Sequence, residues 1–212
     1  MQIEDADLFS QYLLQEFGRR SVLRVPQRGD NVRLVELACK NAKEEAERCT
    51  DKEERTNATV VMLGKMLSMD PPKRLESFDI SNISGTDIVA SMVVFKDGKP
   101  AKSQYKKFKL EGLENQDDYA SMHQILKRRF TRYQAGDKGF EQAPDLLLIA
   151  GGITHARTAV EALSAIGLTM PVFGMVKDDR HRTRALVTPD GNEISIEQNQ
   201  SVFAFIGNIQ EE

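Results

Sequence analysis

The first third of the chain reads as helices with short breaks. Apolar residues at helical spacing predict an amphipathic helix over residues 6–17, and a short apolar run predicts a strand over 22–26. A long helical pattern then runs from 31 to 69, where two prolines end it. Because the middle of this pattern is polar and charged, we expect residues 1–72 to form a helical lead-in arm rather than an independent domain.

After the prolines the pattern becomes strand-like. Three apolar stretches separated by turn signals predict an antiparallel meander over residues 74–82, 87–96 and 102–110. The later elements alternate in type: helix 116–133, strand 145–150, helix 153–166, strand 171–176, a hairpin around 189–192 and a helix from 198 to the end.

This order of elements predicts an α/β domain over residues 73–212. Meander strands followed by alternating helix and strand imply a mixed sheet with helices on both faces. This is the order of the ribonuclease H-like fold, in which the first and fourth strands lie side by side. Asp79 in the first strand and Ala150 at the end of the fourth are therefore predicted neighbours.

Asp79 is the first candidate for chemistry. An acid inside an apolar strand is costly unless it is paired or binds a cation, although backbone donors could also satisfy it. Two adjacent strands could frame a metal site with acids at 79 and 150, but position 150 is Ala150. The pair Gly151-Gly152 then begins a helix, and either binds a phosphate with its amides or forms a turn that close packing requires.

The cysteine spacing and the apolar runs of the chain indicate its cellular compartment. Cys39 and Cys49 stand ten residues apart, which fits neither a zinc knuckle nor a disulfide framework and favours reduced thiols. No run approaches the roughly 20 apolar residues of a membrane span. The N-terminus lacks the basic and apolar regions of a signal peptide. We therefore expect a cytoplasmic protein with no membrane partner.

Charge is unevenly distributed although the net charge is only −3. Basic residues crowd the middle third, whereas residues 185–212 carry five acids and no Lys or Arg. Such a local basic field indicates either a polyanion site or a solvated charged surface.

Six stretches in order resemble the C-terminal endonuclease region of the UvrC family, the excinuclease subunit of bacterial nucleotide excision repair. The similarity covers roughly residues 30–212. The stretches are Phe78–Asn82, Ala90–Phe95, Asp117–Met122, Lys127–Phe130, Pro144–Ile149 and Gly174–Asp179.

The resemblance implies an activity. Family members cut damaged double-stranded DNA on the 5′ side of a lesion, in a complex with UvrB that UvrA has prepared. Phosphodiester hydrolysis of this kind needs a cation, and Mg²⁺ or Mn²⁺ suits carboxylate ligands.

The resemblance also assigns residues. Asp79 matches the first catalytic acid and is the expected metal ligand, Asp118 matches a further acid, and Ala150 stands at the second catalytic aspartate of an Asp-Gly-Gly turn. Asp118 could instead cap the helix that starts there. The family's catalytic histidine follows a stretch like 201–207, and the chain ends at Glu212. We therefore expect a C-terminally truncated domain with impaired incision.

Candidate phosphate contacts lie on a strand, a helix and a loop. His155 and His181 are expected in exposed turns rather than as ligands. The alternative functions are a non-catalytic DNA- or partner-binding module on the same fold and a different ribonuclease H-like nuclease. The DNA-binding candidates are Lys106, Lys107, Lys127, Arg128, Arg129, Lys177, Arg180, Arg182 and Arg184.

Overall fold

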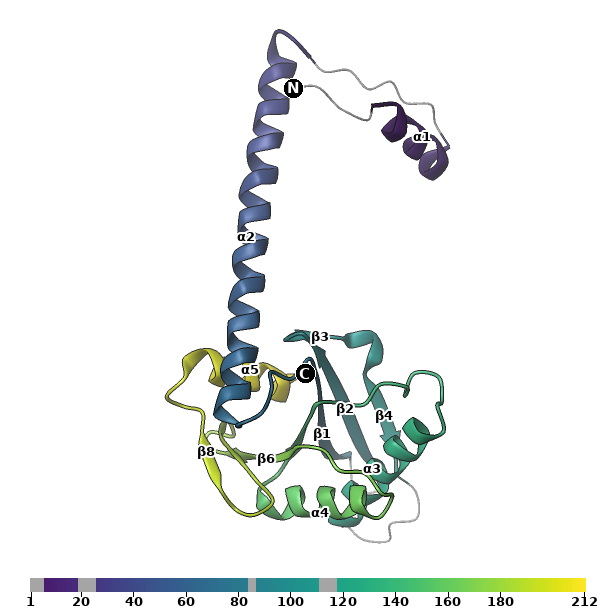
Figure 1. The fold of residues 1–212 in the computed structure, drawn as a ribbon, viewed down its shortest axis with the longest axis vertical. Coiled ribbons are helices and arrows are strands. Elements are labelled where there is room, and N and C mark those ends of the chain that lie inside the picture. The colour runs from purple at the N-terminus through teal and green to yellow at the C-terminus, as the bar shows by residue number, and fades with distance from the viewer. Residues whose placement is uncertain (1–5, 19–25, 84–86, 111–117) are drawn as a thin grey trace. The chain divides into compact units, whose positions relative to one another are not determined.

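A computed structural model describes residues 6–18, 26–83, 87–110 and 118–212 (Figure 1). The chain forms two compact units, Met1–Lys52 and Glu53–Glu212. Apart from Pro26, the strand expected over 22–26 lies outside the described residues. The domain boundary expected between 72 and 73 stays a prediction.

Helices account for the first unit. α1 spans Ala6–Phe17, and α2 spans Asp30–Met66 and continues into the second unit. No glycine or proline interrupts α2 until Gly64, and ion pairs one turn apart lie along its exposed middle, such as Lys40 with Glu44 at 3.7 Å. No helix in the described part is long and apolar enough to cross a membrane.

The second unit is built on one mixed sheet. The strand order is β3-β2-β1-β5-β6-β7-β8, and β4 also pairs with β2. β1, β5 and β6 run parallel, whereas the other pairings are antiparallel. The strands are β1 Arg74–Ile83, β2 Asp87–Lys96, β3 Lys99–Pro100, β4 Lys106–Lys109, β5 Leu146–Ala150, β6 Val172–Lys177, β7 Thr183–Val187 and β8 Glu193–Ser195.

The third meander strand is shorter than expected. The stretch 102–110 begins with a 3₁₀ turn, Lys102–Gln104, and only Lys106–Lys109 pairs with β2. The other expected elements are present with small shifts at their ends. Three more helices complete the unit: α3 Asp118–Gln134, α4 Ile153–Ser164 and α5 Gln200–Glu211.

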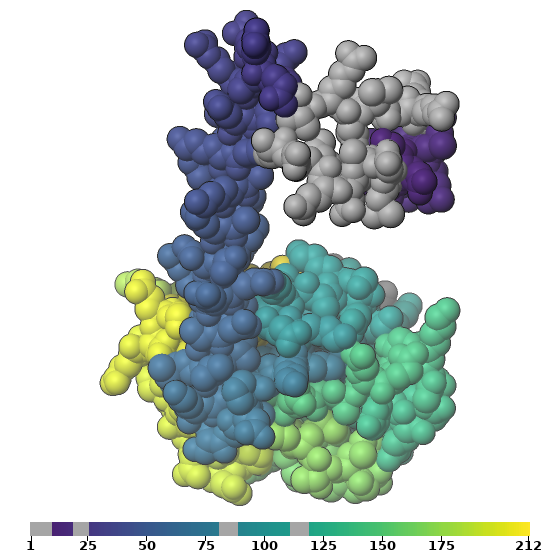
Figure 2. All heavy atoms as spheres, turned by 45° about the horizontal axis from the view of Figure 1, so that its top comes forward, coloured from purple at the N-terminus to yellow at the C-terminus, as the bar shows by residue number. Residues whose placement is uncertain are grey.

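Helices cover both faces of the sheet, as expected. Phe78 and Leu147 pack with α3 and α4 on one face, which we call the α3/α4 face. Leu75 and Leu148 pack with α5 and the end of α2, including Leu63, on the other, which we call the α5 face. Alternation along each strand decides which residues face which layer. In the space-filling view, the teal residues of β2–β4 adjoin the green residues that follow α3 (Figure 2).

Candidate functional site

Three parallel strands run to the same edge of the sheet, where β5 and β6 end while β1 continues to Ile83 in its pairing with β2. The last registered pair of β1 and β5 is Phe78 with Ile149, so Asp79 and Ala150 follow side by side. Ala150 in turn pairs with Met175, and Lys177 comes two residues later on β6. The predicted neighbourhood of Asp79 and position 150 is therefore correct. Ligands of open α/β sheets commonly bind at such carboxyl ends.

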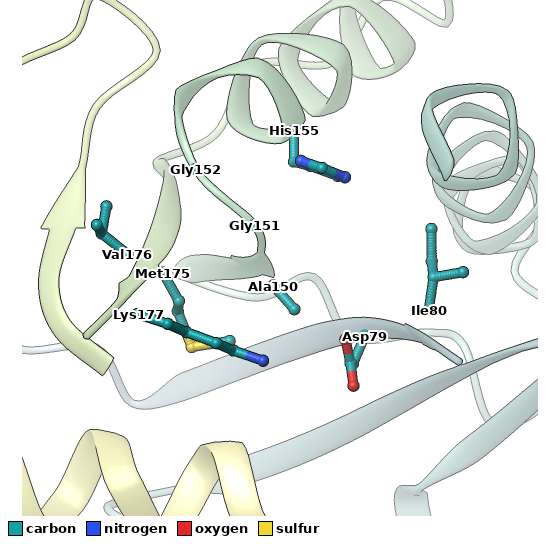
Figure 3. Close-up of a pocket in the computed structure, with 9 residues that line it drawn as sticks. All are labelled: Asp79, Ile80, Ala150, Gly151, Gly152, His155, Met175, Val176 and Lys177. Atoms are coloured by element: carbon teal, nitrogen blue, oxygen red, sulfur yellow. The ribbon is translucent and has the colours of Figure 1, made fainter. Parts of the chain in front are cut away.

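A pocket of about 370 Å³ opens at this edge (Figure 3). In the close-up, the amino group of Lys177 points toward Asp79 and Ala150, and the His155 side chain projects from the start of α4. The pocket is lined by Asp79, Ile80, Ala150, Gly151, Gly152, His155, Met175, Val176 and Lys177.

Asp79 is an available carboxylate. Its side chain is exposed, and it makes no hydrogen bond or ion pair with any residue that the structure describes. Backbone donors among those residues therefore do not satisfy it. Such a carboxylate retains its oxygens for a ligand that enters the pocket.

The donor set around Asp79 does not fit a tightly held divalent cation. Mg²⁺ and Mn²⁺ prefer several oxygen ligands, whereas the pocket offers one carboxylate beside the methyl of Ala150 and the amine of Lys177. In the described part of the chain, no group of three or more His, Cys, Asp or Glu could hold a metal ion.

A second carboxylate lies nearby that the sequence did not indicate. Glu212 lines an adjoining hollow of about 200 Å³ together with Asp79. It is already engaged, because Lys102 forms an ion pair with it at 2.9 Å and the hydroxyl of Tyr105 donates to it at 3.2 Å. Burial, followed by the charge of Glu212, raises the pKa of Tyr105 to about 12.

Gly151, the first glycine of the pair after β5, serves close packing. Gly151 has φ +116°, and an ideal Cβ there would collide with the His155 imidazole. Beneath it, a Cβ on Gly174 would lie 2.7 Å from the carbonyl oxygens of Gly151 and Gly152. These contacts favour the packing explanation for Gly151, whereas a Cβ on Gly152 would meet nothing within 4 Å.

His155 is the pocket residue that the sequence reasoning missed. It was expected in an exposed turn, but it lies in the first turn of α4, half-buried, at the pocket wall. Its ring stacks on Tyr119 of α3, with centroids 4.9 Å apart. Its position four residues after Gly151 was the available signal, because a helix that begins there turns residue 155 back toward the strand end. His181 is exposed in a turn, as expected.

Asp118 begins α3, but its side chain lies outside the described residues. Both its roles, near a metal or as a helix cap, stay predictions.

The loop after β6 is held by one carboxylate. Asp178 accepts hydrogen bonds from the backbone amides of Arg180 and Arg182 at 2.9 and 2.8 Å, and from the Arg182 guanidinium. The Arg182 amide, followed by its guanidinium, lowers the pKa of Asp178. Gln210 of α5 ties the same loop down by donating to the carbonyl of His181 at 2.7 Å.

The predicted DNA-binding residues separate by environment. Lys107 pairs with Ser91, which pairs with Asp79, so Lys107 shares the face of Asp79 about 10 Å away across two strands. Lys106 alternates to the other face and lies over the Phe140 ring. The exposed members are Lys107, Lys127, Arg128, Lys177, Arg180 and Arg182.

Two of the predicted arginines after β6 are held in partly exposed ion pairs. Arg182 pairs with Asp178 at 2.9 Å, and Arg184 pairs with Glu193 at 2.5 Å. Both pairs are partly exposed, so each arginine would have to exchange its partner to reach a phosphate.

Arg129 is not a DNA contact, contrary to the sequence prediction. Its side chain is fully buried and forms an ion pair with the equally buried Glu76 at 2.7 Å. It also donates to the carbonyls of Phe140 and Gln142 at 3.2 and 2.6 Å. Arg74 adds a second ion pair to Glu76 at 2.6 Å. Because α3 turns residue 129 inward, Arg129 neutralises a core carboxylate instead of meeting solvent.

The order β4-β2-β1-β5-β6, with Asp79 where the central strand β1 leaves its pairing with β5, defines the class as ribonuclease H-like. A family model described as the UvrC RNAse H endonuclease domain matches residues 64–212, and one described as the UvrC ribonuclease H-like domain matches residues 1–49. The chain belongs to this UvrC family.

Curated relatives agree with the family models. The UvrABC system protein C of Thermoanaerobacter pseudethanolicus is 41% identical over 226 aligned residues, covering 100% of this chain and 37% of the relative. That of Caldanaerobacter subterraneus subsp. tengcongensis is 39% identical, covering 100% and 36%. The chain thus spans little more than a third of the curated relatives it matches.

A solved endonuclease V from Ciona intestinalis in complex with DNA also matches. It covers 64% of this chain and 59% of that chain, at 16% identity and a TM-score of 0.38. A likeness this low carries no argument.

Proposed function

We propose that this chain is the endonuclease part of a UvrC-type excinuclease, which makes the 5′ incision beside a lesion in bacterial nucleotide excision repair. The observation that carries the proposal is the adjacency of position 150, at the end of β5, and Asp79, where β1 passes beyond its pairing with β5. The family places its two catalytic aspartates at these positions. The proposed partners are damaged double-stranded DNA and UvrB, after UvrA has acted, in the cytoplasm.

Incision by this chain is impaired under the proposal. In the family, Mg²⁺ or Mn²⁺ would neutralise the phosphate and activate water. With Ala150 in place of the second carboxylate, the residues present do not hold such an ion well, and no step is assigned to it. What remains is phosphate binding by Lys177 at the pocket. Catalytic groups that act as a unit lose activity steeply when one is missing.

DNA binding itself does not need the second carboxylate. Lys107 and Lys177 lie on the face of Asp79, while Lys127, Arg128 and Arg180 are exposed elsewhere on the second unit. Phosphate contacts of this kind give affinity that falls with salt and depends little on sequence. This suits an enzyme whose cutting site is set by a lesion.

Nicking of supercoiled plasmid DNA in Mn²⁺ tests the proposal. We expect negligible nicking by the chain and a measurable gain in Ala150→Asp, which a further Asp79→Ala change abolishes. Robust Mn²⁺-dependent nicking by the unchanged chain would contradict the impairment. Nicking by Ala150→Asp that survives Asp79→Ala would contradict the site.

A non-catalytic DNA- or partner-binding module is the second candidate. It is favoured by the methyl of Ala150 and the amine of Lys177 beside a lone carboxylate, a combination that suits an anion as well as a cation. Salt-dependent DNA binding that Lys177→Ala weakens, combined with inactive Ala150→Asp, would favour the module over the nuclease.

A further inference from the structure

Two stacked aromatic rings lie beside the pocket, and the proposed phosphate binding by Lys177 does not use them. Tyr119 in the first turn of α3 and His155 in the first turn of α4 have ring centroids 4.9 Å apart and planes inclined by 38°. His155 lines the pocket that also contains Asp79 and Lys177. The aromatic pair therefore extends from the phosphate-binding pocket onto the surface.

The His155 ring has a fixed position. It lies directly on the backbone of Gly151, where a Cβ would collide with it, and Tyr119 stacks on it from the neighbouring helix. The two helices pack against each other through buried side chains such as Met122 and Ala156. A ring held in this way loses little conformational freedom when a flat ligand stacks on it.

Tyr119 is unusually exposed for an aromatic residue. Its exposed fraction is 45%, and among the described residues of the second unit the other exposed large apolar side chains are Val61 and Met62 of α2, at 39% and 38%. A tyrosine ring with this exposure, beside a pocket with a lysine amine, matches the two needs of a nucleotide. The ring receives the base, and the amine receives the phosphate.

We propose that Tyr119 and His155 form a stacking platform for a nucleobase of the DNA strand whose phosphate lies at Lys177. The proposal rests on the proposed function. Stacking accepts every base, because each has a flat π-face, so the platform adds affinity without sequence preference. A base can use the platform only when it has left its own stack, so the substrate class is DNA with a locally unpaired strand at the cutting site.

Two matched single-stranded oligonucleotides, one with bases and one without, distinguish base stacking from phosphate binding. The probe is a labelled single-stranded oligonucleotide, compared with one of equal length whose central residues are abasic. Fluorescence anisotropy measures the affinity of the chain and of its variants for both. Tyr119→Ala is expected to weaken binding of the base-bearing strand by about 5- to 150-fold, with no change for the abasic strand. His155→Ala is expected to act in the same direction.

Three controls accompany these variants. Tyr119→Phe keeps the ring and should bind both strands normally, and Tyr12→Ala removes a tyrosine that is 55% exposed in the first unit and should change nothing. In the unchanged chain, 2-aminopurine in the central positions should be quenched on binding, a readout that does not depend on any variant's folding. Absence of quenching would overturn the platform.

The outcomes distinguish the two proposals. If Lys177→Ala weakens both strands while Tyr119→Ala weakens neither, or both equally, the platform is wrong and the phosphate site stands. If the chain binds neither strand, or Lys177→Ala changes neither affinity, the phosphate site fails and the platform fails with it.

Discussion

Two acids three residues apart on β1 have opposite environments. Glu76 points to the α3/α4 face, is fully buried and is paired with Arg74 and Arg129. Asp79 belongs to the α5 face, is exposed where β1 leaves its pairing with β5, and has no partner among the described residues. The same strand thus carries one carboxylate that stabilises the fold and one that remains open to a ligand.

The difference teaches how to recognise a site residue. A buried charge is retained only when partners compensate its lost hydration, and Glu76 has two arginines for that purpose. A carboxylate that the fold leaves without a partner, at the end of parallel strands, is available for chemistry. Being an acid in an apolar strand does not separate the two cases.

The matched pair Glu76→Gln and Asp79→Asn tests this contrast most directly. Glu76→Gln leaves two buried guanidinium groups without their carboxylate and should lower the free energy of unfolding by about 3–5 kcal/mol. Asp79→Asn removes an exposed, unpaired charge and should change it by no more than about 0.5 kcal/mol. Urea unfolding measures both. Equal destabilisation by the two variants would erase the contrast.

Restoring the second acid should make the open site respond to metal. Ala150→Asp places a carboxylate beside Asp79, so Mn²⁺ at 100 times its dissociation constant should stabilise this variant by about 2.7 kcal/mol. The unchanged chain should gain much less at the same Mn²⁺ concentration. Thermal unfolding with and without Mn²⁺ checks this, with Ala150→Asn as the uncharged control. Equal stabilisation of all three chains would count against the site.

Neighbouring arginines on α3 test the buried ion pair of Glu76, with a smaller expected effect. Arg129→Lys keeps the charge but loses the planar guanidinium that reaches Glu76 and two backbone carbonyls. It should lower the free energy of unfolding by about 1–3 kcal/mol. Arg128→Lys, at the adjacent exposed position, should change the free energy of unfolding by no more than about 0.5 kcal/mol. Equal destabilisation of the two variants in urea unfolding would mean that the buried contacts of Arg129 do not stabilise the fold.

We expect the smallest effect at Asp178, a half-buried acid that is held by hydrogen bonds from its own loop. Its pKa is lowered in the folded state, so its contribution to loop order is present above the ordinary value of 3.8 and is lost as the pH falls through the lower, folded-state pKa. The amide signals of Arg180 and Arg182 in NMR spectra should shift together below pH 3.8. Asp178→Asn should remove that transition, and an unchanged transition in that variant would contradict the assignment to Asp178.

The sequence predicted much of the fold because strand and helix patterns are local. The parallel placement of β1 beside β5, and therefore of Asp79 beside position 150, followed from element order alone. Lys102–Gln104 was expected in a strand and formed a 3₁₀ turn instead. The local pattern did not show that only the end of that stretch would pair with β2.

Charge type could not predict which basic residues face solvent. Arg128 and Arg129 are identical side chains in adjacent positions, yet a 100° step around α3 turns one to the surface and the other into the core. The partner that holds Arg129 inside, Glu76, lies 53 residues earlier. His155 was missed for the same reason, since its contacts with Tyr119 and Gly151 arise only when α4 packs beside α3.

The sequence by itself therefore determined the order of elements, the family and the missing second aspartate, because these depend on residue type and spacing along the chain. Only the tertiary structure decided which charged side chains are held in ion pairs that stabilise the fold and which remain available to a ligand. It paired Glu76 with Arg129, left Asp79 at the pocket beside Lys177, and set the His155 ring at the pocket wall. Burial and partnership are made by contacts between distant segments, and no local pattern encodes them.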